Sequence, residues 1–203
     1  MPLPDEPARL AAGSLPMHAW VDESMIQRGQ AGTYLLAAVV ADPARCNAMR
    51  EVLRSLRTGR EPKLHWSSET PGRRRKITAA VAALEIPAVV VIGTPLDHRR
   101  QERARRCCME TLLPHLATMG VGHVWLEART HTLNAKDRDH VVGMVGRRLI
   151  ASTLRVEPLQ PSVEPMLWLS DIVAGAVGAA RRGEDRYLQP LRPMLTELAA
   201  DVR

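Results

Sequence analysis

The strongest constraint on the fold is the run TYLLAAVVA at positions 33–41, which is apolar on both faces. A strand of this kind is typical of the centre of a sheet that is covered on both sides. A second run, AVVVI at 88–92, has the same character. The segment HAWVDES at 18–24 reads as another strand and is separated from the first run by a turn-like stretch at 27–32. These features predict a β-hairpin that leads into a central sheet.

The remainder of the chain alternates between helical and extended patterns. Further strands are expected at 123–129 and 153–159, and helices at 43–57, 73–84, 97–119, 135–150, 166–180 and 187–198. A hairpin followed by alternating helices and strands indicates an α/β fold, with a mixed sheet and helices on both faces. Residues 1–15 contain three prolines and no periodicity, so they are interpreted as a flexible leader before a single domain at 16–203.

Composition excludes several classes of protein. The chain has 203 residues, of which 45% are hydrophobic and 25% charged, as in an average globular domain. The longest weakly charged stretch, 166–180, carries Asp171 in its middle, so no membrane-spanning segment and no membrane partner are expected. The N-terminus lacks the pattern of a secretory signal, and three cysteines do not make a disulfide framework. A cytoplasmic location follows as the expectation.

The formal net charge is +6, and only three of the 28 basic residues are lysine. Arginine clamps phosphate in a bidentate manner, which makes nucleic acid a candidate partner. The codon bias of a GC-rich genome explains the same composition equally well. The arginines gather at 73–76, 99–106, 147–148 and 181–182, where they suit either contacts with phosphates or solvated helix faces.

Three acidic residues stand in apolar surroundings: Asp22 at the end of the first strand, Glu127 inside HVWLEAR, and Asp171. Carboxylates avoid such places unless they are paired, neutralised or bound to a cation. Each has an ordinary explanation: a turn residue for Asp22, a pair with Arg129 for Glu127, and bonds to an arginine or to backbone amides for Asp171. If the fold brings the three together, their repulsion calls for a hard divalent cation such as Mg²⁺, and two such ions support hydrolysis of phosphodiesters.

The motifs WVDES, YLLAAVVA, KLHW, LEAR and LWLSDIVAGAV, in this order, resemble the domain of unknown function 3800 family over about residues 17–190. That family is usually grouped with ribonuclease H-like folds. The resemblance implies a ribonuclease H-like mixed sheet, with Asp22, Glu127 and Asp171 as ligands of Mg²⁺ or Mn²⁺. Many relatives have aspartate where this chain has Glu127.

Other side chains are candidates for supporting roles. Asp137 or Asp139 can supply a fourth carboxylate, although Asn134 with Asp137 also resembles a helix-capping box. His65 can contact a phosphate or transfer a proton, or it can be merely structural. Trp66 can stack on a base or pack in the core.

The leading functional prediction is a metal-dependent nuclease that hydrolyses DNA or RNA. The sequence leaves the oligomeric state open, with a homodimer as one option. The first alternative is a non-catalytic regulatory protein on the same fold, which binds nucleic acid or a protein partner. The second is a hydrolase of small phosphoesters. No Walker loop, dinucleotide-binding glycine motif or nucleophile elbow occurs in the sequence.

Overall fold

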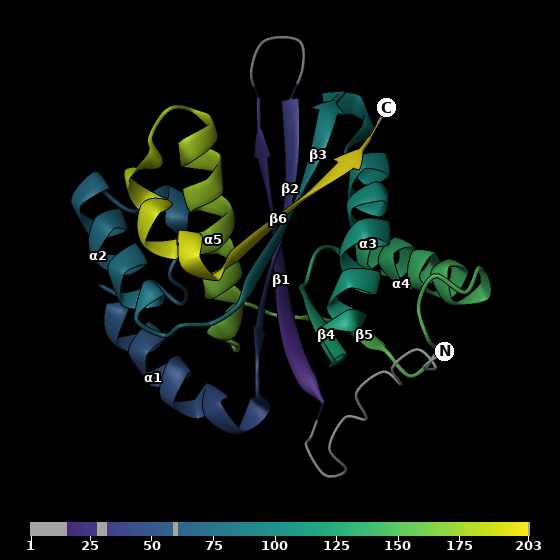
Figure 1. The fold of residues 1–203 in the computed structure, drawn as a ribbon, viewed down its shortest axis with the longest axis horizontal. Coiled ribbons are helices and arrows are strands. Elements are labelled where there is room, and N and C mark those ends of the chain that lie inside the picture. The colour runs from purple at the N-terminus through teal and green to yellow at the C-terminus, as the bar shows by residue number, and fades with distance from the viewer. Residues whose placement is uncertain (1–15, 28–31, 59–60, 203) are drawn as a thin grey trace, which may run out of the picture.

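A six-stranded mixed sheet forms the centre of the protein in the computed structural model, which describes residues 16–27, 32–58 and 61–202 (Figure 1). The strand order is β5-β4-β1-β2-β3-β6. The strands are β1 (Met17–Ile26), β2 (Gly32–Ala41), β3 (Ala88–Leu96), β4 (Val121–Glu127), β5 (Arg155–Leu159) and β6 (Leu195–Asp201). β2 is antiparallel to both of its neighbours, and the other three strand pairs are parallel. The predicted mixed sheet that begins with a hairpin is confirmed.

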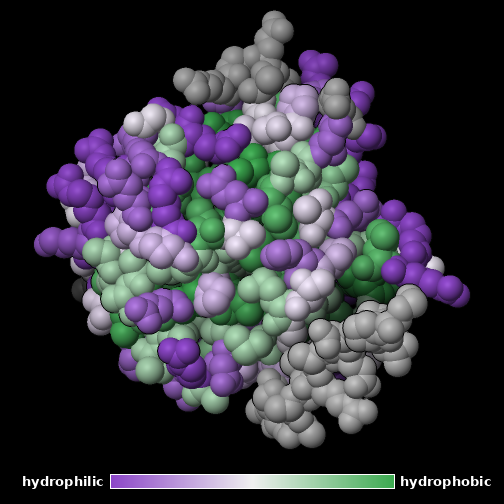
Figure 2. All heavy atoms as spheres, in the orientation of Figure 1, coloured by the Kyte–Doolittle hydropathy of each residue, from purple (hydrophilic) through white to green (hydrophobic). Residues whose placement is uncertain are grey.

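Helices cover both faces of this sheet, as expected. On one face lie α1 (Cys46–Leu56), α2 (Pro71–Ala82) and α5 (Met166–Arg181), and on the other lie α3 (Gln101–Thr118) and α4 (His131–Gly146) (Figure 1). The alternation of side chains along β1 and β2 divides the apolar residues between two cores, one on each face. Figure 2 shows hydrophilic side chains over the outer surface of α2 and hydrophobic ones in the middle of the view.

Helix α5 is buried over almost its whole circumference. Among the described residues, the sheet packs against one side of α5, and α1 and α2 pack against the other. A helix in this position can carry few charges. The single carboxylate of Asp171 therefore requires a specific environment.

The end of the chain differs from the sequence-based expectation. In place of a helix at 187–198, short 3₁₀ turns at Asp185–Tyr187 and Gln189–Met194 lead into β6. Pro190 and Pro193 lack the backbone N–H that a continuing helix needs. The residues that follow pair in parallel with the edge of β3, from Ala88 opposite Leu195 to Thr94 opposite Asp201.

The predicted leader at 1–15 lies outside the described residues. Within the described part of the chain, no helix is both long enough and apolar enough to cross a membrane.

Candidate functional site

Two of the three predicted acids lie on neighbouring parallel strands. β1 and β4 pair in register through Trp20 with Trp125 and Val21 with Leu126, so the next residues along the two strands are Asp22 and Glu127. Because side chains alternate along a strand, Asp22 is on the same face as Trp20, which belongs to the core beneath α5. The carboxylates of β1 and β4 therefore stand beside each other at the edge of that core.

The third acid approaches from α5. Ser170 donates a hydrogen bond of 2.6 Å to the backbone carbonyl of Trp20 and so ties the helix to β1. The adjacent residue, Asp171, uses Oδ2 to accept a 2.8 Å bond from the backbone N–H of Trp66, and the same oxygen lies 2.9 Å from Nδ1 of His65. The segment between α1 and α2 thus positions the Asp171 carboxylate.

The electrostatics link the three acids. Burial raises the pKa of Asp22 well above its ordinary value, and the charges of Glu127 and Asp171 raise it further. The backbone N–H of Glu23, 2.7 Å from Asp22 Oδ1, acts in the opposite direction because it stabilises the ionised form. The structure thus brings together the three acids that the sequence singled out, and the charges of Glu127 and Asp171 disfavour the ionised form of Asp22.

Two basic side chains face this cluster. Lys63 Nζ lies 3.1 Å from Glu127 Oε1, and His65 contacts Asp171. The hydrogen bond with Asp171 raises the pKa of His65. An imidazole that donates from Nδ1 to a carboxylate keeps Nε2 for a second interaction. Glu127 and Asp171 therefore each have one basic partner, and the structure places His65 beside the acidic cluster.

The small residues of α5 accommodate Trp66. A Cβ atom built on Gly175 would come within 2.2 Å of the Trp66 ring, so the indole lies directly against the helix backbone one turn after Asp171. Trp66 is buried, and the guanidinium of Arg74 lies over its ring at 4.9 Å from the centroid. Of the two interpretations of Trp66, core packing is the correct one. Its packing fixes the neighbouring His65 next to Asp171.

The structure does not bring Asp137 or Asp139 to this cluster. Both lie on α4, which covers the opposite face of the sheet, and Asp139 is exposed. Asp137 is buried and accepts bonds of 3.0 Å from Nε and Nη2 of Arg105 and a bond of 2.8 Å from Arg129. The prediction that either residue supplies a fourth carboxylate needs correction, because the sheet separates them from Asp22. The proposed capping box is also wrong, since Thr130 caps α4.

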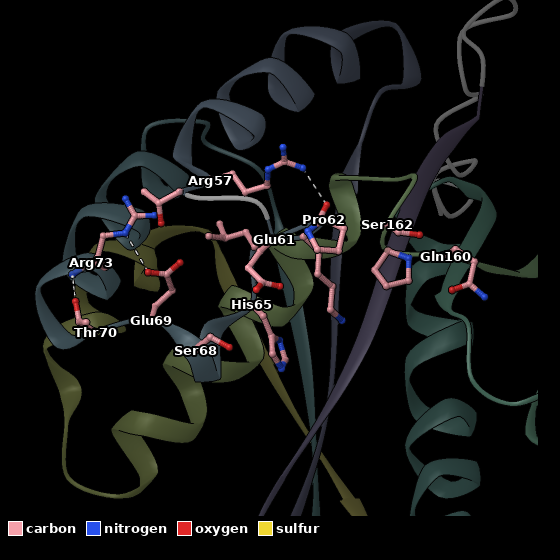
Figure 3. Close-up of a pocket in the computed structure, with 14 residues that line it drawn as sticks. Arg57, Glu61, Pro62, His65, Ser68, Glu69, Thr70, Arg73, Gln160 and Ser162 are labelled. Atoms are coloured by element: carbon pink, nitrogen blue, oxygen red, sulfur yellow. Dashed lines mark hydrogen bonds and ion pairs between the residues drawn. The ribbon is translucent and has the colours of Figure 1, made fainter.

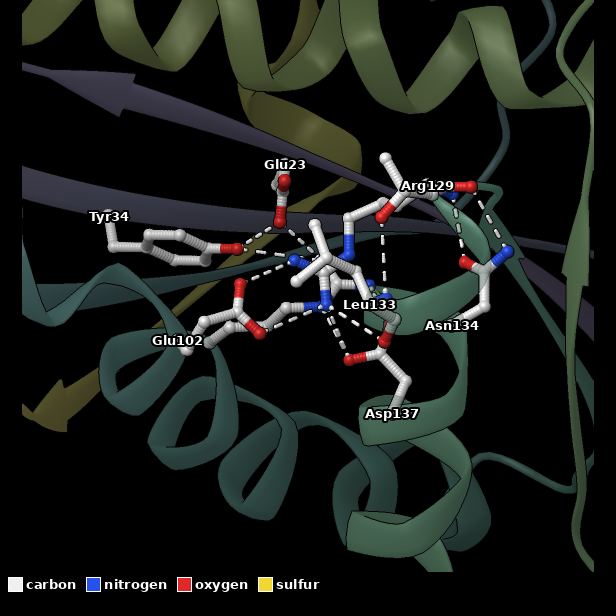
Figure 4. A network of polar contacts seen from close by, with 9 residues as sticks. Glu23, Tyr34, Glu102, Arg129, Leu133, Asn134 and Asp137 are labelled. Atoms are coloured by element: carbon white, nitrogen blue, oxygen red, sulfur yellow. Dashed lines mark hydrogen bonds and ion pairs between the residues drawn. The ribbon is translucent and has the colours of Figure 1, made fainter.

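Asp137 belongs to a buried ionic network that the sequence analysis missed (Figure 4). Arg105, only 3% exposed, contacts Asp137 and Glu23, and Glu23 also accepts a hydrogen bond from Tyr34. Arg129 pairs with Glu102 rather than with Glu127. A sequence signal for this network exists. Arg105 is in helical phase with Cys108, Met109 and Leu112, and all three are buried on α3.

This network holds the same two strands as the acidic cluster, from the other side of the sheet. Glu23 follows Asp22 on β1, and Arg129 lies two residues after Glu127, at the end of β4. Arg105 and Asp137 join these two points through charged hydrogen bonds. The relative position of the two strand ends is therefore fixed by buried ion pairs, which are costly to break.

The donor set of the acidic cluster fits a hard divalent cation. It consists of carboxylate oxygens, which Mg²⁺ and Mn²⁺ prefer, and the mutual repulsion seen at Asp22 is what such an ion relieves. With Lys63 and His65 bonded to two of the carboxylates, no three His, Cys, Asp or Glu side chains of the described residues are grouped closely enough to enclose an ion. Binding of one ion by all three carboxylates would therefore require these side chains to move.

Comparison with protein-family models gives no match for this chain, and comparison with curated proteins gives none either. Among solved structures, the complex of PCNA with RNase HII from Archaeoglobus fulgidus contains a similar chain, with 13% sequence identity and a TM-score of 0.46. The similarity covers 87% of this chain and 77% of that one.

Proposed function

We propose that the protein is a metal-dependent nuclease of ribonuclease H-like fold, related to the domain of unknown function 3800 family. The observation that carries the proposal is the cluster of Asp22 and Glu127 on adjacent parallel strands with Asp171 on the crossing helix. The strand order supports it as well, because a ribonuclease H-like sheet also has its first and fourth strands side by side.

In this proposal Asp22, Glu127 and Asp171 hold one or two Mg²⁺ or Mn²⁺ ions. The ions supply charge neutralisation at the phosphodiester and help to activate water. Lys63 moves from Glu127 toward the phosphate, where its ammonium group offsets negative charge. His65, oriented by Asp171 through Nδ1, offers Nε2 to the substrate as a hydrogen-bond or proton donor.

The surface charge of the chain fits a polyanionic substrate. The net charge of +6 favours association with a phosphate backbone, and the cluster of acids needs cations before a phosphate can approach it. This combination of a basic surface with an acidic centre supports a nuclease more than a regulatory protein that only binds.

The test is a cleavage assay on single- and double-stranded DNA and RNA with Mg²⁺, with Mn²⁺ and with a chelator. We expect cleavage of at least one substrate with metal and none with the chelator. Tight binding of nucleic acid without cleavage under any of these conditions would favour the non-catalytic regulatory alternative.

A further inference from the structure

A pocket of about 580 Å³ opens beside the acidic cluster (Figure 3). It lies between the end of α1, the segment 61–70, the start of α2 and the residues 160–162 that follow β5. Its size is that of a pocket for a small molecule or for one building block of a polymer. We name it the side pocket.

The side pocket is continuous with the acidic cluster through two shared side chains. Lys63 and His65 both line it, and they are the same two residues that contact Glu127 and Asp171. A ligand in the side pocket therefore lies one side chain away from the carboxylates. The side pocket is therefore in the right place to hold the part of a substrate that lies next to the bond that reacts.

The rim of the side pocket carries two arginines held by backbone carbonyls. Arg57 donates a 3.1 Å bond to the carbonyl of Pro62, and Arg73 donates to the carbonyl of Leu56 and to Glu69. A guanidinium has five N–H donors. Bonds to described residues use one of them in Arg57 and two in Arg73. Both arginines are thus oriented and retain donors for a phosphate.

Apart from the carboxylate of Glu61, the remaining lining suits a nucleoside. Pro62 and Pro161 provide apolar surfaces, while Ser68, Ser162 and Gln160 provide hydrogen-bonding groups. Such a mixture is typical of pockets that take an apolar ring with polar edges. A base within a duplex is paired and stacked, so it enters a pocket only after it has been unpaired.

We propose that the side pocket binds one unpaired nucleotide of a single-stranded nucleic acid, adjacent to the bond that is cleaved, with Arg57 and Arg73 on its phosphate. The inference rests on the proposed nuclease function and adds the substrate class. The proposal assigns substrate binding to the arginines of the side pocket and not to the arginines at the start of α3. Those lie on the other side of the sheet and are Arg99, Arg100, Arg103 and Arg106.

The test is binding of a fluorescent 12-nucleotide single strand and of the same sequence as a blunt duplex, measured by anisotropy with Ca²⁺ present to neutralise the acidic cluster. Arg57→Ser should weaken single-strand binding about tenfold, as expected for the loss of one charged hydrogen bond. It should also lower the slope of log affinity against log salt by about 0.7. The matched control is Arg103→Ser on α3, which also removes one exposed arginine and should leave affinity within about twofold.

A second variant fills the pocket without removing charge. Ser162→Trp places a large ring at the exposed rim and should weaken single-strand binding by about tenfold or more, with thermal stability unchanged. Equal effects of Arg57→Ser and Arg103→Ser, duplex binding as tight as single-strand binding, or no binding at all would each overturn the proposal.

The experiments distinguish a wrong assignment of the side pocket from a wrong nuclease proposal. If the protein cleaves nucleic acid but Arg57→Ser and Ser162→Trp keep the KM of the wild type, the pocket assignment is wrong and the nuclease proposal stands. If the single strand binds in an Arg57-dependent manner and nothing is cleaved, the pocket assignment stands and the nuclease proposal is wrong.

Discussion

Asp22 and Glu127 occupy matched positions on parallel strands, one step beyond the registered pair of Val21 and Leu126. The arrangement places two carboxylates side by side at the edge of an apolar core, and Asp171 adds a third charge from α5. Lys63 and His65 offset the charges of Glu127 and Asp171, whereas burial leaves the ionised form of Asp22 unfavourable in the folded protein.

Asp22→Asn should stabilise the metal-free protein. The pKa of Asp22 is raised in the folded state, so ionisation at neutral pH opposes folding, and the isosteric amide removes the charge while its oxygen can still accept from the Glu23 N–H. We expect a gain of about 1 kcal/mol, or about 3 °C in the melting temperature at pH 7 with a chelator present.

The pH dependence of that gain provides its control. The gain should shrink as the pH falls through the raised pKa of Asp22, and it should vanish below the ordinary value of about 3.9, where the wild-type carboxyl is neutral in both states. A melting temperature for Asp22→Asn below that of the wild type at pH 7 would contradict the assigned electrostatics.

Divalent cations should reverse the order of stability. At an Mg²⁺ or Mn²⁺ concentration of ten times Kd, the wild type should gain about 1.4 kcal/mol, because only the folded state presents the converging carboxylates. Asp22→Asn and Asp171→Asn should gain less. The measurement is thermal unfolding at increasing metal concentration, with Ca²⁺ as a comparison. Equal gains for the wild type and both variants would mean that the ions bind elsewhere.

Gly175→Ala should disturb the site through packing alone. The added methyl group would meet the Trp66 ring at 2.2 Å, so Trp66 and the attached His65 must move away from α5. We expect a loss of about 2 kcal/mol in unfolding free energy and a lower cleavage rate. The matched control is Gly143→Ala in α4, where nothing lies within 4 Å of the new methyl. That change should stabilise the protein by up to about 1 kcal/mol, because alanine is the better helix former. A neutral result for Gly175→Ala would show that Trp66 does not need the glycine.

Arg105→Met should destabilise the protein strongly. It leaves Asp137 and Glu23 without their shared partner in a buried network, and breaking such a network costs about 3 kcal/mol or more. The neighbouring exposed residue supplies the comparison, since Arg106→Met should change stability by less than about 0.5 kcal/mol. Chemical denaturation of both variants measures the difference. Similar midpoints for the two would mean that the network contributes little to stability.

Much of this architecture is readable in the sequence. The two-sided apolar runs at 33–41 and 88–92 mark central strands, since burial on both faces leaves no place for polar side chains. The last segment was not predictable in the same way. The pattern at 187–198 suits a helix. Two prolines and pairing with the open edge of β3 oppose that helix, and the edge of β3 exists only in the folded protein.

The site was predictable to a similar extent. Isolated acids in apolar elements indicated Asp22, Glu127 and Asp171, because an unpaired carboxylate is too costly there to be accidental. The partners of those acids were not indicated. Lys63 and His65 reach Glu127 and Asp171 across more than 60 residues of sequence, and Asp137 looked like a further ligand because its two arginine partners become neighbours only in the fold.

The most direct test of the central claim compares the cleavage rates of four carboxylate variants with that of the wild type, in a single-turnover assay with Mn²⁺ on a labelled single strand. Asp22→Asn, Glu127→Gln and Asp171→Asn each remove one charge from the acidic cluster and should lower the rate by about 100-fold or more. Asp139→Asn removes an exposed carboxylate on the other face of the sheet and should keep the wild-type rate. Wild-type rates in the first three variants, or a loss of activity confined to Asp139→Asn, would contradict the account.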